Sequence, residues 1–131
     1  MLNIKRIYDK PSDDDGIRIL VDRLWPRGMS KERAKINFWF KDIAPSNELR
    51  KSFHDSAINF NEFKTMYLEE LSGYYNATHD FSIKKDKDSV NPIAEILRLL
   101  KTGNKNVTLL YGLKDEINNN AAVLKEFILH K

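Results

Sequence analysis

The sequence contains no cysteine, and this absence removes several classes of function at once. Disulfides, zinc ribbons, iron–sulfur clusters and thiol nucleophiles all depend on cysteine. Residues 1–7 lack the apolar core of a signal peptide, and no uninterrupted apolar run approaches the length of a membrane span. We therefore expect a soluble, cytoplasmic protein with no membrane partner.

A strong excess of one charge is also lacking. The 131 residues include 22 lysines and arginines against 19 aspartates and glutamates, which gives a net charge of +3 spread along the chain. This mild excess permits a nucleic-acid or phosphate partner without arguing for one. Because 41% of the residues are hydrophobic, a chain of this length can bury one continuous core. We expect a single domain over residues 1–131.

The motifs of the common α/β enzymes are absent as well. The sequence has no glycine-rich phosphate loop, nucleophile elbow or dinucleotide fingerprint. His54, His79 and His130 lie far apart and have no second ligand at i,i+4 spacing, so no metal site is expected. The Asp-Asp-Asp-Gly run at 13–16 lacks the glutamate and the alternating spacing of a calcium loop, and we interpret it as a solvated turn.

Several short segments have the composition of strands. Residues 4–8 and 107–111 combine β-branched, aliphatic and aromatic residues, and 17–21 is an apolar run interrupted only by Arg18. Such runs are typical of strands that are covered on both faces of a mainly parallel sheet. The segment 36–43 fits a strand and a helix almost equally, and the strand is slightly favoured.

Helical signals occupy most of the remaining chain. Ser30, Ser46 and Asn91 are suitable N-caps, and Gly103 is placed to end a helix. Gly73 is expected to stop the longest helix, and the polar segment 74–90 is interpreted as a mobile surface insertion. The expected helices cover about 31–35, 47–53, 59–71, the stretch from Pro92 to Gly103, and a last stretch that includes 121–128.

Strands that alternate with helices predict a compact, three-layer-like α/β domain with a small, largely parallel sheet and flanking helices. Ligands of such sheets bind beyond the C-terminal ends of the strands, where the loops diverge and helix N-termini point at the crevice. This rule selects the loops after Val21 and after Tyr111 as candidate sites.

The loop after Val21 concentrates polar and aromatic side chains in one turn, namely Asp22, Arg23, Trp25 and Arg27. Two arginines near a helix N-terminus suit a phosphate or carboxylate group, which each guanidinium can bind through two hydrogen bonds. An alternative interpretation has Asp22 paired with an arginine, Trp25 in the core and Arg27 in solvent. The sequence leaves both interpretations open.

The loop that follows the expected strand at 107–111 offers a second group of candidates. Tyr111 and Lys114 could supply a proton donor and a positive charge, and the asparagines at 118–120 could donate amide hydrogen bonds. Alternatively, one asparagine caps the last helix and the others form the turn. We assign Asp22, Tyr111 and Lys114 as candidate catalytic residues, and Arg23, Trp25, Arg27, Asn119 and Asn120 as candidate ligand-binding residues.

Four parts of the chain resemble the YeaO-like bacterial proteins, a family with a domain of unknown function; they are 6–9, 15–28, 44–46 with 48–51, and 108–111 with 114–115. The most specific part is the run Val-Asp-Arg-Leu-Trp-Pro-Arg-Gly that ends at Gly28. The resemblance extends over nearly the whole chain and implies a compact α/β domain without an assigned activity. The positions that match the family are Asp22, Arg23, Trp25, Pro26, Arg27, Tyr111, Lys114 and Asn119.

The chain departs from that family in two places. Asn120 stands where the family commonly has histidine, and the segment 74–90 is longer and more polar than usual. An asparagine can donate and accept hydrogen bonds, but it cannot shuttle a proton near neutral pH. Any chemistry of relatives that depends on this histidine is therefore not expected here.

Our leading hypothesis is that the protein binds or acts on a small anionic ligand between the two loops. Arg23, Arg27 and Lys114 would contact the anion, Tyr111 would act as an acid, and Asp22 would orient an arginine. The alternatives are a nucleic-acid-binding or regulatory module, and a partner-binding scaffold with Trp25 as an exposed anchor. The sequence specifies no cofactor, no oligomeric state and no definite enzymatic activity.

Overall fold

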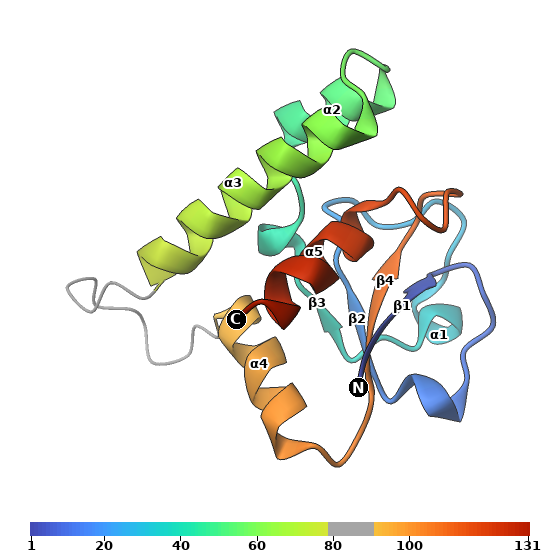
Figure 1. Cartoon of the computed structure of the whole chain (residues 1–131). Coiled ribbons are helices and arrows are strands. Elements are labelled where there is room, and N and C mark those ends of the chain that lie inside the picture. The colour runs from blue at the N-terminus through green and yellow to red at the C-terminus, as the bar shows by residue number, and fades with distance from the viewer. Residues whose placement is uncertain (79–90) are drawn as a thin grey trace.

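The computed structural model describes residues 1–78 and 91–131 and has an α/β fold built on a four-stranded sheet (Figure 1). Every neighbouring pair of strands runs parallel, which confirms the predicted sheet type. The C-terminal ends of the strands therefore lie at one edge of the sheet. In spatial order the strands are β1 (Leu2–Arg6), β4 (Val107–Tyr111), β2 (Ile17–Leu20) and β3 (Phe38–Trp39).

The sheet is covered on both faces, which explains the apolar runs of its central strands. One face packs against a large core that includes Ile19 and Leu109, and the other packs against a smaller core that includes Leu20 and Leu110. The alternation follows from the two-residue period of a strand. β4 and β2 each have a neighbour on both sides, and all five residues of β4 are buried.

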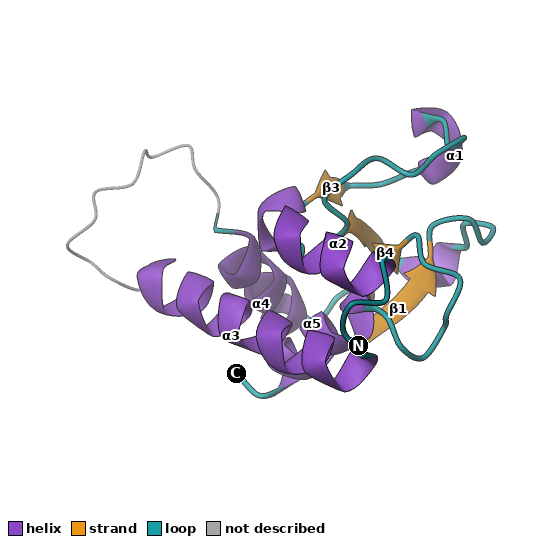
Figure 2. Ribbon diagram, turned by 90° about the horizontal axis from the view of Figure 1, so that it is seen from above, coloured by secondary structure: helices purple, strands orange, loops and turns teal. Residues whose placement is uncertain are grey.

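The helices divide unequally between the two faces (Figure 2). The large core lies beneath four helices, and the smaller core lies beneath a short helix and the loops beside it. The four are α2 (Asn47–His54), α3 (Phe60–Thr78), α4 (Pro92–Thr102) and α5 (Asn120–Leu129), and the short helix is α1 (Lys31–Ala34). Among the described residues, no helix is both long and apolar enough to cross a membrane.

The expected N-caps are confirmed. The side chains of Ser30, Ser46 and Asn91 each accept a hydrogen bond from a backbone N–H in the first turn of α1, α2 and α4 respectively. Gly103 ends α4 with a φ of 69°, a left-handed conformation that glycine adopts without the strain of a side chain. These local signals correctly locate the helix ends.

The ambiguous segment 36–43 contains only a two-residue strand. Phe38 and Trp39 pair with β2, after which Lys41–Ile43 forms the 3-10 helix η2. β3 lies at the edge of the sheet, and its pairing with β2 ends where the chain turns into η2. The predicted strand is therefore confirmed only for the central part of the segment 36–43.

The prediction that Gly73 ends the long helix is wrong. α3 continues through this glycine to Thr78. Tyr74 and Tyr75 pack against the large core beyond it, and the Tyr75 ring meets Phe127 of α5 edge-on with 6.1 Å between ring centroids. This packing outweighs the helix penalty of one glycine, which is about 1 kcal/mol. The rest of the expected insertion, residues 79–90, lies outside the described residues.

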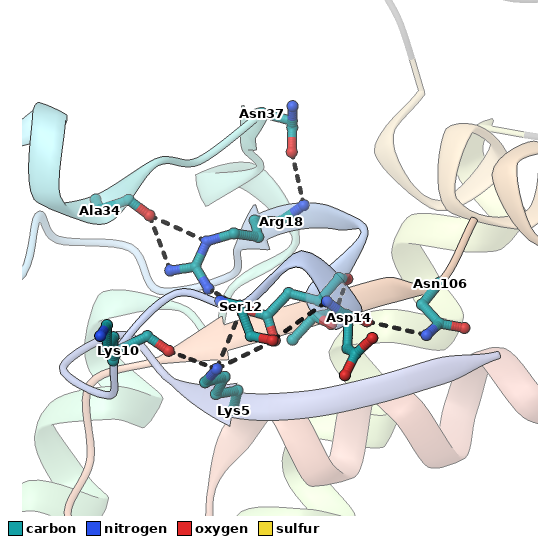
Figure 3. Close-up of polar contacts among 10 residues, drawn as sticks. Lys5, Lys10, Ser12, Asp14, Arg18, Ala34, Asn37 and Asn106 are labelled. Carbon is teal, nitrogen blue, oxygen red and sulfur yellow. Dashed lines mark hydrogen bonds and ion pairs between the residues drawn. The ribbon is translucent and has the colours of Figure 1, made fainter.

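The acidic run at 13–16 is not simply a solvated turn. It forms the 3-10 helix η1 (Asp13–Asp15), in which Asp15 is buried. The Asp15 carboxylate accepts hydrogen bonds from the Arg18 guanidinium, the Lys5 ammonium at 3.1 Å and the Ser12 backbone N–H at 2.9 Å. Arg18 also donates to the Ala34 carbonyl at 2.8 Å. Figure 3 shows that Lys5 and Arg18 approach the turn from two sides.

We predict that Asp15→Ala lowers the free energy of unfolding by about 3–5 kcal/mol, because it leaves the buried Arg18 guanidinium without its carboxylate. Burial acts to raise the pKa of Asp15, but hydrogen bonds from Ser12, Lys5 and Arg18 outweigh it and hold the pKa below its ordinary value. The stabilisation that the ionised Asp15 carboxylate contributes is therefore present above its unfolded-state pKa of about 3.9. It is lost as pH falls through the folded-state pKa of Asp15.

Urea unfolding at neutral and acidic pH measures both effects. Asp13→Ala is the matched control, since Asp13 is exposed in the same turn. Equal losses of stability in the two variants would contradict the role given to Asp15.

We also predict that Gly73→Ala raises the free energy of unfolding by about 0.5–1 kcal/mol. A Cβ atom at Gly73 would have no heavy atom within 4 Å, and the residue lies inside a helix. Gly103→Ala is the contrasting variant, because its positive φ strains any side chain and should lower stability. Thermal unfolding of the two variants tests the prediction, which fails if Gly73→Ala lowers the melting temperature.

Candidate functional site

A cavity of about 390 Å³ lies beyond the C-terminal ends of β2 and β4. Both loops selected from the sequence contribute to it, and so does one face of α2. Its walls comprise residues 22–27 after β2, Gly112 and Leu113 after β4, Arg50, Phe53 and His54 of α2, together with Pro45, Phe63 and Asn120.

A larger hollow of about 560 Å³ lies at the opposite edge of the sheet, around η1 and Gly103. Its one buried charged side chain is Arg18, whose guanidinium is already bound by Asp15 and by the Ala34 carbonyl. Among the described residues that line this hollow, no buried side-chain donor or acceptor lacks a hydrogen-bond partner. We take the cavity at the C-terminal edge as the candidate site, because both loops selected from the sequence contribute to it.

Asp22 connects the elements that surround the cavity. Its Oδ1 accepts a hydrogen bond from Asn120 Nδ2 at 3.0 Å, and its Oδ2 accepts one from the Gly112 backbone N–H at 2.8 Å. The Asn120 amide also donates to the Val21 carbonyl at 3.1 Å. The expected alternative, in which Asp22 pairs with an arginine, does not occur among the described residues. Asp22 instead joins the ends of β2 and β4 to the start of α5.

Burial raises the pKa of Asp22 above its ordinary value. The hydrogen bonds from Asn120 and Gly112 and the positive charge of Arg50 act in the opposite direction but are weaker. The ionised form of Asp22 is therefore less favourable here than in water. A carboxyl group of this kind is easier to protonate than an exposed aspartate.

Arg23 has a structural role on one side of its guanidinium. Nε donates to the Pro45 carbonyl at 3.0 Å and Nη2 donates to the Ala44 carbonyl at 3.2 Å, which holds the loop against the segment before α2. Arg27 is exposed, and its backbone carbonyl accepts a hydrogen bond from the Tyr8 hydroxyl at 2.8 Å. Both arginines belong to the cavity wall, as the sequence suggested for the loop.

Helix α2 adds two cavity residues that the sequence did not single out, Arg50 and His54. Together with Phe53 they have the i, i+3, i+4 spacing that places side chains on one face of a helix. The Nε atom of Arg50 is buried and has no hydrogen-bond partner in the described part of the chain. Leaving a buried donor unpaired costs about 1–3 kcal/mol. Arg50 therefore provides the cavity with an unused donor.

Trp25 does not fit the role of an exposed anchor for a partner protein. The side chain is half-buried, its Nε1 donates to the Met29 carbonyl at 2.6 Å, and its ring meets Trp39 edge-on with 5.4 Å between centroids. These contacts fix Trp25 as part of the cavity wall and leave it no free hydrogen-bond donor.

Three other candidate residues are not among those that line the cavity. Tyr111 is buried in the large core as the last residue of β4, and burial, followed by the negative charge of Glu116, raises its pKa. Lys114 is exposed. Asn119 caps α5, accepting from the Ala122 N–H at 2.8 Å and donating to the Asp115 carbonyl at 3.0 Å. The side-chain alternation of β4 explains the position of Tyr111, which follows Leu109 into the large core.

No cluster suited to a metal ion was found in the segments 1–78 and 91–131, where no three histidine, aspartate or glutamate side chains gather in the required way. His54 lies on the cavity wall and His130 lies at the end of α5. His79 is outside the described residues.

Comparison with known proteins agrees with the resemblance found in the sequence. A family model described as the inactive DUF488-N3 subclade matches residues 1–131. The uncharacterized protein YeaO of Escherichia coli (strain K12) is 38% identical over 127 residues, which cover 97% of this chain and 96% of that protein. The uncharacterized protein Rv3073c of Mycobacterium tuberculosis (strain ATCC 25618 / H37Rv) is 35% identical over 127 residues, which cover 97% of this chain and 92% of that protein. No solved structure matches. The chain therefore belongs to the inactive DUF488-N3 subclade and is a member of the YeaO-like family.

Proposed function

We propose that the protein binds a small anionic ligand in the cavity at the C-terminal edge of the sheet. The observation that carries this proposal is the buried Arg50 Nε, which has no hydrogen-bond partner among the described residues. A phosphate or carboxylate oxygen is the natural acceptor for such a donor, because charge-assisted hydrogen bonds are among the strongest in proteins. A ligand of this type would remove the cost of leaving the donor unpaired.

The charge of the cavity supports the same ligand. Three arginines, Arg23, Arg27 and Arg50, contribute to its wall, against the single carboxyl group of Asp22. Both oxygens of that carboxyl group already accept hydrogen bonds from Asn120 and Gly112. Asn120 is also the first residue of α5, so the partial positive charge of a helix N-terminus lies at the cavity.

Binding is better supported than catalysis. Among the residues assigned as catalytic from the sequence, only Asp22 lines the cavity, whereas Tyr111 and Lys114 do not. Asn120 contacts Asp22 at 3.0 Å, but an asparagine cannot exchange a proton near neutral pH. The description of the subclade as inactive is in keeping with this assignment. We propose Arg50, Arg27 and the free side of Arg23 as the anion contacts.

We predict that Arg50→Met weakens the binding of inorganic phosphate about ten- to one-hundred-fold, the effect of losing one charge-assisted hydrogen bond. Methionine keeps an unbranched apolar stem like that of arginine but removes the guanidinium with its donors and its charge. Isothermal titration calorimetry with phosphate measures the affinity of the wild type and of the variant.

Lys51→Met is the matched control for this experiment. Lys51 neighbours Arg50 on α2 but is exposed and is not part of the cavity wall, so its replacement removes one positive charge without touching the site. We expect phosphate affinity close to that of the wild type. Equal affinities in Arg50→Met and Lys51→Met, or no phosphate binding by the wild type, would sink the proposal.

We also predict that sulfate binds more weakly as pH rises through the raised pKa of Asp22, because ionised Asp22 repels the anion. Sulfate keeps its double negative charge over this range, so the change reports on the protein. The free energy of unfolding of the ligand-free protein should also decrease as pH rises. The folded state holds the Asp22 proton more tightly than the unfolded state, so this stabilisation is lost as pH rises through the folded-state pKa.

His54→Gln is the companion variant, because it removes the histidine side chain that lines the cavity beside Asp22. The decrease in sulfate affinity that the His54→Gln variant still shows as pH rises is assigned to Asp22, and it should disappear in the Asp22→Asn variant. Sulfate affinity that does not depend on pH in His54→Gln would refute the effect of Asp22.

A further inference from the structure

Each of the two loops places an exposed leucine in the wall of the anion cavity. Leu24, in the loop after β2, is 56% exposed, and Leu113, in the loop after β4, is 39% exposed. Exposed leucines are ordinary when they are scattered singly over a surface. Here, two of them belong to the same concave site, which indicates that an apolar group covers them when the site is occupied.

The rest of the wall is also more apolar than a free anion requires. Trp25, Phe53 and Phe63 contribute aromatic side chains to the same cavity. Sites for organic molecules have this composition, with mainly apolar walls and a few polar groups that fix the orientation of the ligand. A site for inorganic phosphate alone would need hydrogen-bond donors on all sides, which these walls do not provide.

The size of the cavity leads to the same conclusion. A volume of about 390 Å³ corresponds to roughly a dozen water-sized groups. Inorganic phosphate has five non-hydrogen atoms and would leave most of that space to solvent. The remaining space is sufficient for an apolar group of about the size of a six-membered ring.

Arg50 and the two leucines lie on different parts of the cavity wall. Arg50, whose Nε is buried, belongs to α2, whereas the exposed Leu24 and Leu113 belong to the two loops. A ligand that fills the cavity can therefore place a charged group against Arg50 and an apolar group against the two leucines.

We infer that the ligand is an amphipathic organic anion, whose phosphate or carboxylate head meets Arg50 and whose apolar, ring-sized body covers Leu24 and Leu113. This inference rests on the proposed function, because it requires an anion in the cavity. It adds the chemical class of the ligand, and it assigns the preference for an apolar body to the two leucines.

The test compares three probes by calorimetry on the full chain, namely inorganic phosphate, phenyl phosphate and benzyl alcohol. We expect phenyl phosphate to bind about ten-fold or more tightly than inorganic phosphate, because its ring is transferred from water to the apolar wall. Benzyl alcohol, which has the ring without the charge, should bind far more weakly than phenyl phosphate.

The double variant Leu24→Ser/Leu113→Ser should lose most of the preference for phenyl phosphate over inorganic phosphate. Both leucines are exposed, so the fold should tolerate the change, and circular dichroism checks that it does. Ile117→Ser is the matched control, since Ile117 lies in the same loop as Leu113 and is 79% exposed but is not part of the cavity wall. This control should keep the full preference.

The outcomes distinguish this inference from the proposed function. Equal binding of inorganic phosphate and phenyl phosphate would overturn the inference and leave the anion site in place. A preference for phenyl phosphate that survives in the double leucine variant would also overturn it. If no anion binds, or if benzyl alcohol binds as well as phenyl phosphate, the proposed function fails and the inference fails with it.

Discussion

The carboxyl group of Asp22 is the point on which the arrangement of the cavity depends. Its hydrogen bonds to the Gly112 N–H and to Asn120 Nδ2 connect the loop after β2 with the loop after β4 and with the start of α5. The approach to Gly112 is close, because a Cβ atom there would lie 3.0 Å from Asp22 Oδ2 and would have to displace the carboxyl group by a few tenths of an ångström. The two walls of the cavity are therefore held at a set separation by one carboxyl group.

The two edges of the sheet use charge differently. At the N-terminal edge, Asp15 is matched by Arg18 and Lys5, so the charges of this cluster are satisfied within the chain. At the C-terminal edge, Asp22 accepts hydrogen bonds only from neutral donors, the Gly112 N–H and the Asn120 amide. The Arg50 Nε there has no hydrogen-bond partner among the described residues. The first arrangement stabilises the fold, whereas the second leaves positive charge available to a ligand. This difference, and not the size of the hollows, is why we propose the ligand site at the C-terminal edge.

Local patterns in the sequence predict the strands, the helix caps and the two loops, because each depends on residues close together in the chain. The errors come from distant contacts. Gly73 lies within α3 because Tyr75 reaches Phe127, and the turn at Asp15 packs against β4, where the Thr108 hydroxyl donates to the Asp15 carbonyl. Arg50 was missed for the same reason. Its helix was expected, but no local signal indicates that one face of α2 closes the cavity.

The persistence of an unpaired donor in a marginally stable protein argues for a ligand on physical grounds. A buried donor without a partner costs about 1–3 kcal/mol, a considerable part of the roughly 5–15 kcal/mol that stabilises a typical domain. An apolar residue in place of Arg50 would avoid this cost while still packing beside Phe53 on the cavity face of α2. The arginine is therefore unfavourable for folding alone. The ligand that we propose would supply the missing acceptor, and the stability that the free protein lacks at this position would then contribute to the affinity.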